Sequence, residues 1–259
     1  MTRWNRVVTD LATATGFLTR YPLPAGMQTE QPEGARAAWA FPLVASLAMV
    51  LPALVLVLFS ALGAGPLLST LSAIATSLLV TGGLHEDGLA DSADGLFGGR
   101  TRDDVLAIMK DSRTGAYGTL ALVLSITLRA TALAMLVAKG PENAALLFIA
   151  AAAAGRAVMV RQWYALPLAR ADGVAATLGR PDKNNTLCAA IISLVIVALA
   201  SALAGELVPA LFALVALAVS AYAFTFFVRR RIGGHTGDTL GAIAQIGETV
   251  FLIALVILV

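Results

Sequence analysis

Long apolar runs separated by short polar segments dominate this chain. No charged residue occurs between positions 37 and 84, a stretch too long for one membrane span of roughly 20 residues and about right for two. A Gly-Ala-Gly-Pro sequence at 63–66 supplies the turn between them. Five further spans are predicted at 116–138, 143–162, 186–204, 207–228 and 236–259. The pattern therefore predicts an all-α, polytopic membrane bundle of about seven helices in one domain.

The positions of the basic residues support this count. With seven spans, segments 1–36, 85–115, 156–185 and 229–235 lie on the N-terminal side, and they hold 16 of the 18 Lys and Arg residues. Of the others, Lys139 falls on the opposite side and Arg129 within a span. Because basic loops stay in the cytoplasm, we expect the N-terminus and these segments there, and the C-terminus outside.

Composition agrees with a membrane protein. The chain is 58% hydrophobic and 13% charged, whereas soluble domains are about half apolar and a quarter charged. We expect the lipid bilayer as a partner and no nucleic acid. The single cysteine, Cys188, excludes an intramolecular disulfide, and we expect it to be a small core residue.

The N-terminal segment has helical periodicity. Its apolar positions alternate with Arg3, Arg6 and Asp10, which predicts a helix lying on the cytoplasmic membrane surface. A Tyr-Pro-Leu-Pro sequence at 21–24 would end it; a partly ordered lead-in is the alternative. The apolar positions are Trp4, Val7, Val8, Leu11 and Leu18.

Acidic residues concentrate after the second span, where seven of the 16 fall between positions 86 and 111. Asp87, Asp91 and Asp94 are spaced i, i+4 and i+7, on one face of a helix, where like charges repel. A divalent cation would remove the repulsion, and carboxylate oxygens suit Mg²⁺ or Mn²⁺ rather than Zn²⁺. We therefore expect segment 85–115 to hold a metal through these three residues and Glu86, with a solvated acidic loop as the alternative.

A short amphipathic helix is expected directly afterwards. Thr101 with Asp104 is typical of a helix N-cap, and Val105 with Met109 forms part of an apolar stripe that would rest on the bundle. Gly115 would end this helix.

Basic residues surround the acidic segment. Arg100, Lys110 and Arg113 beside carboxylates suggest an anionic substrate such as a diphosphate, although anchoring to the cytoplasmic side is an alternative for each. Asp111, between two of these cations, could be a metal ligand, a base or an ion-pair partner.

The last span begins with a second polar cluster. Asp238, Gln245 and Glu248 share one helix face with Gly241, and acids within a span usually face the bundle interior. Asp238 could join the acidic site, and Glu248, two turns deeper, could pair with Arg129.

Two histidines and a glycine-rich turn complete the candidates. The Gly-Gly-His-Thr-Gly sequence at 233–237 could hold a phosphate at the helix N-terminus. Because neither His85 nor His235 lies in a zinc motif, we favour substrate contacts over metal binding for both, with a role as base left open.

Four segments in the same order resemble the adenosylcobinamide-GDP ribazoletransferase family, also called cobalamin (5′-phosphate) synthases, and they extend over nearly the whole chain. They are GFLTRYPLP at 16–24, TGGLHEDGLADSADGLFGG at 81–99, IMKDSRTGAYG at 108–118 and GGHTGDTLGAIAQIGE at 233–248. One departure is His235, where the family pattern has tyrosine, and it affects only a substrate contact.

The resemblance implies a Mg²⁺-dependent transferase in the bacterial cytoplasmic membrane. Its substrates would be adenosylcobinamide-GDP and α-ribazole or α-ribazole 5′-phosphate, and its products adenosylcobalamin or the 5′-phosphate, and GMP. A ribose hydroxyl would attack the phosphorus attached to cobinamide, a reaction that depends on positioning and charge neutralisation.

These expectations assign a role to each candidate. Asp111 is the leading candidate base, and Asp94 is the alternative. The metal would be bound by Glu86, Asp87, Asp91 and Asp94; substrate would be bound by His85, Arg100, Lys110, Arg113, His235 and Asp238.

Two other functions compete with this one. The Asp91-x-x-Asp94-Gly95 spacing resembles that of CDP-alcohol phosphotransferases, but the spacing after Gly95 departs from theirs, so the resemblance is one of chemistry only. A lipid synthase with this chemistry is the alternative enzyme. A cation or proton transporter could use Glu248, Arg129 and Asp238, but it should concentrate charge near mid-membrane, and most acids here lie in one segment. The sequence leaves open the lower base, the phosphorylation of the acceptor and whether the chain forms a homo-oligomer.

Overall fold

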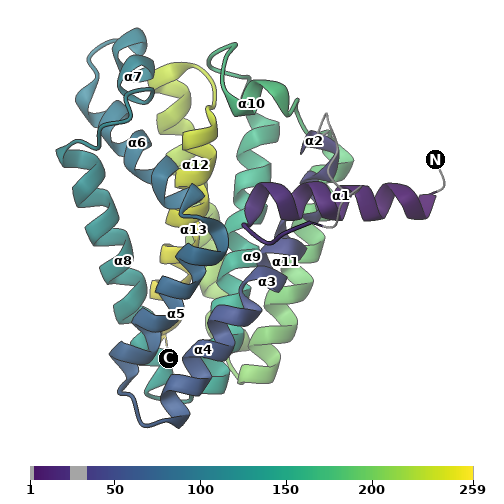
Figure 1. Cartoon of the computed structure of the whole chain (residues 1–259), viewed down its shortest axis with the longest axis vertical. Coiled ribbons are helices and arrows are strands. Elements are labelled where there is room, and N and C mark those ends of the chain that lie inside the picture. Colours follow the sequence, from purple (N-terminus) through teal and green to yellow (C-terminus); the bar gives the residue numbers. More distant parts are fainter. Residues whose placement is uncertain (1–2, 24–33, 259) are drawn as a thin grey trace.

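A computed structural model describes residues 3–23 and 34–258, and all regular elements in these residues are helices (Figure 1). This confirms the predicted all-α class. In chain order they are α1 (Arg3–Leu18), α2 (Gly34–Ala37), the 3₁₀ helix η1 (Ala38–Ala40), α3 (Phe41–Ala48), α4 (Val50–Ala61), α5 (Pro66–Thr81), α6 (Leu84–Gly98), α7 (Arg102–Ile108), α8 (Ala116–Val137), α9 (Pro141–Ala165), α10 (Val174–Thr177), α11 (Lys183–Ala204), α12 (Leu207–Ile232) and α13 (Gly237–Leu258).

Six stretches of the described chain are long and apolar enough to cross a membrane, and a seventh arises if α5 and α6 count as one bent span. The first stretch combines α2, η1, α3 and α4; the others are α8, α9, α11, α12 and α13. The predicted multi-pass bundle is thereby confirmed.

The second predicted span differs in its ending. We expected it to continue to Leu84, with the acidic residues on one face of a helix in the segment after it. Instead, α5 ends at Thr81, and the chain turns by 90° into α6. Gly82 and Gly83 make this turn with φ values of 68° and 67°, in the left-handed region that glycine adopts without strain. The acidic residues therefore lie on a helix packed against α8 and α13.

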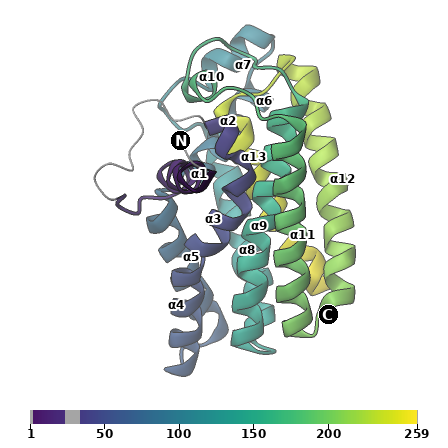
Figure 2. The same ribbon diagram turned by 90° about the vertical axis from the view of Figure 1, so that its right-hand side faces the viewer.

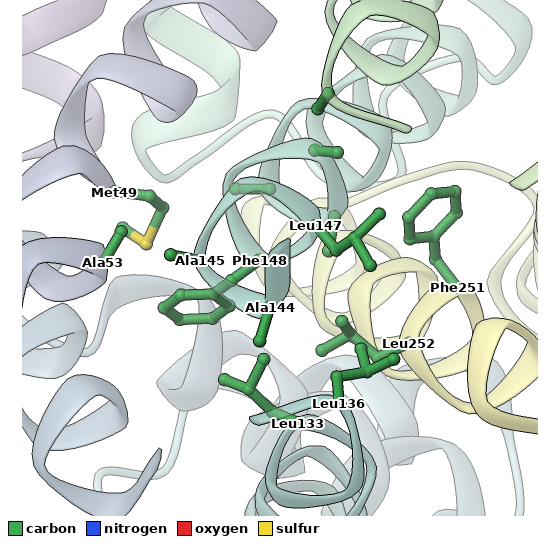
Figure 3. Packing of buried hydrophobic residues seen from close by; sticks show 14 of the residues in the cluster. Met49, Ala53, Leu133, Leu136, Ala144, Ala145, Leu147, Phe148, Phe251 and Leu252 are labelled. Atoms are coloured by element: carbon green, nitrogen blue, oxygen red, sulfur yellow. The ribbon is translucent and has the colours of Figure 1, made fainter. Parts of the chain in front are cut away.

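Two helices form the centre of the bundle. Within their membrane-spanning windows, 72% of α9 and 67% of α13 is buried, against 33% of α11 and 22% of α12, which lie outside (Figure 2). Apolar side chains of α4, α8, α9 and α13 meet in the main core (Figure 3). Cys188 lies exposed on α11, so the prediction that it is a core residue was wrong; α11 buries only one narrow face.

Helix α1 forms as predicted and lies across the long helices (Figure 1); its place on the membrane surface stays a prediction. The ring of Phe17 stacks on Phe41 of α3 with 5.6 Å between centroids. Asp10 accepts hydrogen bonds from Arg36 Nε at 2.8 Å and from Trp39 Nε1 at 3.0 Å. The ring stacking and the two hydrogen bonds hold α1 against the start of the first span. The structure does not describe the Trp4 side chain, which was predicted on the apolar face of this helix. Pro24, at the predicted helix end, also lies outside the described residues.

Helix α7 begins as predicted. Thr101 and Asp104 form a reciprocal capping box, and Val105 and Met109 pack into a small core with α12. The helix ends at Ile108, earlier than expected, and Gly115 is instead the N-cap of α8.

A cluster of buried charges connects four helices in the middle of the bundle. Arg129 of α8 is 2% exposed and lies 3.1 Å from Glu86 Oε1 and 3.4 Å from Glu248 Oε2. Arg156 of α9 pairs with the other oxygen of Glu248, and Gln245 Nε2 donates to Glu86 at 2.9 Å. Two cations and two anions thus neutralise each other where water is excluded.

We expect Arg129→Met to lower the melting temperature of the purified protein strongly. Removing one partner leaves buried charges uncompensated, which costs about 3–5 kcal/mol. The matched control is Lys139→Met, which removes a cation from the exposed segment just after α8. Equal melting temperatures for the two variants would contradict a structural role for the cluster.

Candidate functional site

Helix α6 packs unusually closely against its neighbours. A Cβ atom on Gly88 would lie 2.8 Å from the carbonyl oxygen of Asp238, and one on Gly241 would lie 3.3 Å from the Cα of His85. These glycines let α6 and α13 approach backbone to backbone. The carboxylates that follow Gly88 are thereby placed beside the first turn of α13.

A cavity of about 310 Å³ lies at this crossing. Its polar lining includes His85 and Asp87 of α6, Asp238 of α13, and Arg170 and Asp172 from the segment after α9. Phe17 of α1, Met159 and Trp163 of α9, and Leu168, Ala175 and Leu178 contribute apolar walls. Charged groups therefore meet an apolar surface at one end of the bundle.

Asp238 and Arg170 form an ion pair within this lining. Arg170 Nη2 lies 3.3 Å from Asp238 Oδ2, and the two side chains are 17% and 21% exposed. The other terminal nitrogen of Arg170, Nη1, is buried and has no hydrogen-bond partner among the described residues. Arg170 thus holds a free donor at the cavity. Sequence reasoning counted this arginine only as a cytoplasmic charge, since nothing local connects it to Asp238.

Asp87 and Asp91 remain unpaired on the exposed side of α6. Asp87 is exposed and Asp91 half-buried, and neither accepts a hydrogen bond from a described residue. The negative charges of Asp87, Asp94 and Asp238 repel the Asp91 carboxylate. The positive charge of Arg170 attracts it. Carboxylates of α6 and α13 therefore lie near one another here.

Glu86 and Asp94 have other partners. Glu86 turns into the buried charge cluster, where Arg129 and Gln245 contact one of its oxygens. Asp94 accepts hydrogen bonds from the backbone nitrogens of Gly115 at 2.7 Å and Gly118 at 2.8 Å. Because those amides belong to the start of α8, Asp94 caps this helix from outside it.

The predicted phosphate-binding cations lie away from the cavity lining. Lys110 pairs with Asp172, which is itself a lining residue. Arg113 donates to both oxygens of Asp111; these hydrogen bonds lower the pKa of Asp111 to about 2. With so low a pKa, the Asp111 carboxylate is a weak proton acceptor. Arg100, the third predicted cation, is exposed.

The two histidines differ in position. His85 lines the cavity, its Nδ1 lies 3.3 Å from Arg156, and its Nε2 is buried without a described partner. His235 is 2% exposed and does not line the cavity. Its backbone pairs with the segment after α9 through Pro167 and Ala169, and burial lowers the pKa of its imidazole to about 4. His235 therefore orders the segment that carries Arg170.

The donor set fits a hard divalent cation only in part. Among the described residues, no three acidic, histidine or cysteine side chains converge as a complete metal site. Asp87 and Asp91 supply two neighbouring carboxylates, and Mg²⁺ is typically held by one or two carboxylates together with substrate phosphates. The arrangement is thus compatible with a metal that binds together with a phosphorylated substrate.

An apolar helical bundle with a charged cavity at one end defines a polytopic membrane protein with a site for a polar ligand. The model of the family described as cobalamin-5-phosphate synthase matches residues 10–256. Relatives described as adenosylcobinamide-GDP ribazoletransferase include proteins of Rhizobium johnstonii, 44% identical over 95% of each chain, and of Brucella ovis, 39% identical over 97% of this chain and 98% of the relative. No solved structure matches at a significant level.

The chain belongs to the cobalamin-5-phosphate synthase family, and it is a transferase of cobalamin biosynthesis. The family match covers the whole cavity and the buried charge cluster.

We expect Asp94→Ala to destabilise the protein by about 1–2 kcal/mol, because it leaves two amides of α8 without an acceptor. The measurement is the melting temperature of the purified protein. Asp91→Ala is the matched control on the same helix, since it removes a carboxylate that accepts no described hydrogen bond and relieves repulsion. A loss as large in the control would argue against capping.

Proposed function

We propose that this enzyme transfers the adenosylcobinamide-phosphate group from adenosylcobinamide-GDP to the ribose of α-ribazole or its 5′-phosphate, and releases GMP. The observation that supports it most directly is the cavity itself. Asp87, Asp238 and Arg170 line it together, and Arg170 and His85 each hold a buried nitrogen that has no hydrogen-bond partner in the described part of the chain. Such groups suit a phosphate with its metal and an attacking hydroxyl.

The proposed site would lie at the cytoplasmic face of the bacterial inner membrane. Arg170 lines the cavity, and the nearby chain ends of α9 and α12 carry Arg161 and the three arginines 229–231; basic segments remain cytoplasmic. Both water-soluble substrates would then reach the site from the compartment in which nucleotides occur.

Asp87 and Asp91 are the proposed holders of Mg²⁺, because they alone among the four predicted ligands lack another partner in the described chain. When bound, the ion would neutralise charge on the diphosphate and on the departing GMP. Glu86 and Asp94 would act indirectly in this proposal, by holding α6 against α8 and α13.

The remaining cavity groups would bind and orient the substrates. Arg170 would donate through Nη1 to a non-bridging phosphate oxygen, and His85 Nε2 would contact the substrate near the reacting centre. Asp238 lies within the lining and would accept the proton of the attacking hydroxyl. We favour it over Asp111, which does not line the cavity and whose low pKa makes it a poor base.

The cavity volume limits what enters it. About 310 Å³ is at the lower end for a pocket that encloses a drug-sized ligand. It can hold the diphosphate and part of a ribose, while the corrin ring would remain outside. The exposed apolar rim formed by Leu84 and Leu168 offers a surface for such a ring.

The direct experiment uses the full chain in lipid vesicles with adenosylcobinamide-GDP, Mg²⁺, and either α-ribazole or its 5′-phosphate. GMP release with either acceptor supports the proposal, and the preferred acceptor identifies the substrate. If no GMP forms while CDP-linked alcohols turn over, the enzyme is a lipid synthase and the proposal is wrong.

We expect Asp91→Asn to reduce GMP release at least about a hundredfold, as loss of one group that stabilises transition-state charge does, while the protein still inserts and keeps its melting temperature. Asp103→Asn is the control, since its side chain is 91% exposed on α7. Near-normal turnover by the first variant would exclude Asp91 from the site.

Chelation of Mg²⁺ should abolish GMP release, and readdition should restore it. Asp87→Asn should raise the Mg²⁺ concentration for half-maximal rate at least about tenfold, because one carboxylate ligand is lost. An unchanged Mg²⁺ dependence, with a lower maximal rate only, would show that Asp87 acts on substrate and does not hold the metal.

A further inference from the structure

A second hollow, separate from the catalytic cavity, opens on the opposite side of α9. Its volume is about 680 Å³. Trp163 and Met159 face the catalytic cavity, whereas Arg161, Gln162 and Ala165 of the same helix face this groove. The other walls come from α12 and from Arg180 in the segment before α11. We call this hollow the α9–α12 groove.

Three arginines line the groove, and no acidic residue is among its described lining residues. Arg161 and Arg229 are exposed and make no hydrogen bond or ion pair with a described residue. Arg180 is held in place, because it donates twice to the carbonyl oxygen of Tyr164, at 3.0 and 2.6 Å. The groove is therefore a concentration of positive charge with no acidic counter-ion among the described residues that line it.

The lower part of the groove belongs to the lipid-facing surface. Helix α12 packs mainly on α13 and only loosely on α9 and α11, and it runs along the outside of the bundle (Figure 2). Tyr222 is 75% exposed and Phe226 50% exposed on this side. Ala218 and Ala221 leave room between the helices one turn further from the charged end.

Thr225 and Gln162 form a polar pair in the groove lining, next to the arginines. Thr225 Oγ1 donates to Gln162 Oε1 at 3.1 Å, and Gln162 Nε2 donates to the carbonyl oxygen of Thr239 at 3.1 Å. Because Gln162 is 1% exposed, this pair is fixed and supplies polar atoms below the arginines. The groove thus changes from cationic to polar to apolar along its length.

We propose that the α9–α12 groove binds one anionic phospholipid. Its phosphate would lie between Arg161, Arg180 and Arg229, its glycerol near Gln162, and an acyl chain along Tyr222 and Ala218. Charge complementarity selects an anionic headgroup, since basic pockets between spans at a membrane surface bind such lipids. Direct continuity with the lipid-facing side of α12 favours a lipid over a soluble phosphate compound.

The test is native mass spectrometry of the full chain released from nanodiscs that contain equal amounts of dioleoyl phosphatidylglycerol and dioleoyl phosphatidylcholine. We expect one retained phosphatidylglycerol in preference to phosphatidylcholine. The double variant Arg161→Gln, Arg229→Gln should bind it about tenfold or more weakly. The matched control, Lys139→Gln with Lys183→Gln, has the same net charge and replaces two exposed residues outside the groove lining, so it should bind normally.

Three results would overturn the proposal. Equal retention of the two lipids would remove the headgroup preference, and equal loss in both double variants would make the effect one of net charge. Displacement of phosphatidylglycerol by millimolar GMP would identify the groove as a nucleotide site. Retention can be measured without turnover, so it is independent of the proposed reaction.

Discussion

Neutralisation of buried charge is the constraint on which this architecture depends. An ionised side chain within an apolar bundle destabilises the fold unless an opposite charge pairs with it. Arg129 and Arg156 are almost fully buried. Glu86 and Glu248 provide the opposite charges from α6 and α13. Satisfying all four brings α6, α8, α9 and α13 to one point, and Arg156 of this cluster lies 3.3 Å from His85 Nδ1 on the cavity lining. A packing requirement of the membrane interior is therefore connected directly to one wall of the cavity.

The acidic helix separates two tasks by residue position. Glu86 turns inward to Arg129, and Asp94 reaches the first amides of α8, so both hold the helix in place. Asp87 and Asp91 lie on the remaining surface and have no such partner among the described residues, which is why we assign the metal to them in the proposed function. One turn of helix separates Asp87 from Asp91, and the cost of their repulsion is offset by the anchoring on either side.

The sequence was sufficient for much of the fold. Apolar run lengths predicted the spans, the stripe from Asp238 to Glu248 predicted an inward face, and Glu248 does pair with Arg129. The bend after Thr81 was not predictable, because two glycines permit a turn without specifying its angle. Long-range partners were equally hidden: the contacts of Asp94 with Gly118 and of Arg170 with Asp238 depend on how helices distant in sequence pack.

The right-angle turn also sets a length. Helix α5 has 16 residues and is therefore about 24 Å long, shorter than the hydrocarbon core of about 30 Å. On this side of the molecule the bilayer must thin, or the lipid headgroups must descend toward the turn. The hydrophobic mismatch would bring the water boundary down to the acidic helix locally. The thickness of the bilayer would then affect how deep the carboxylates of α6 lie below the aqueous phase. It would thereby set the distance that a water-soluble substrate travels to reach them.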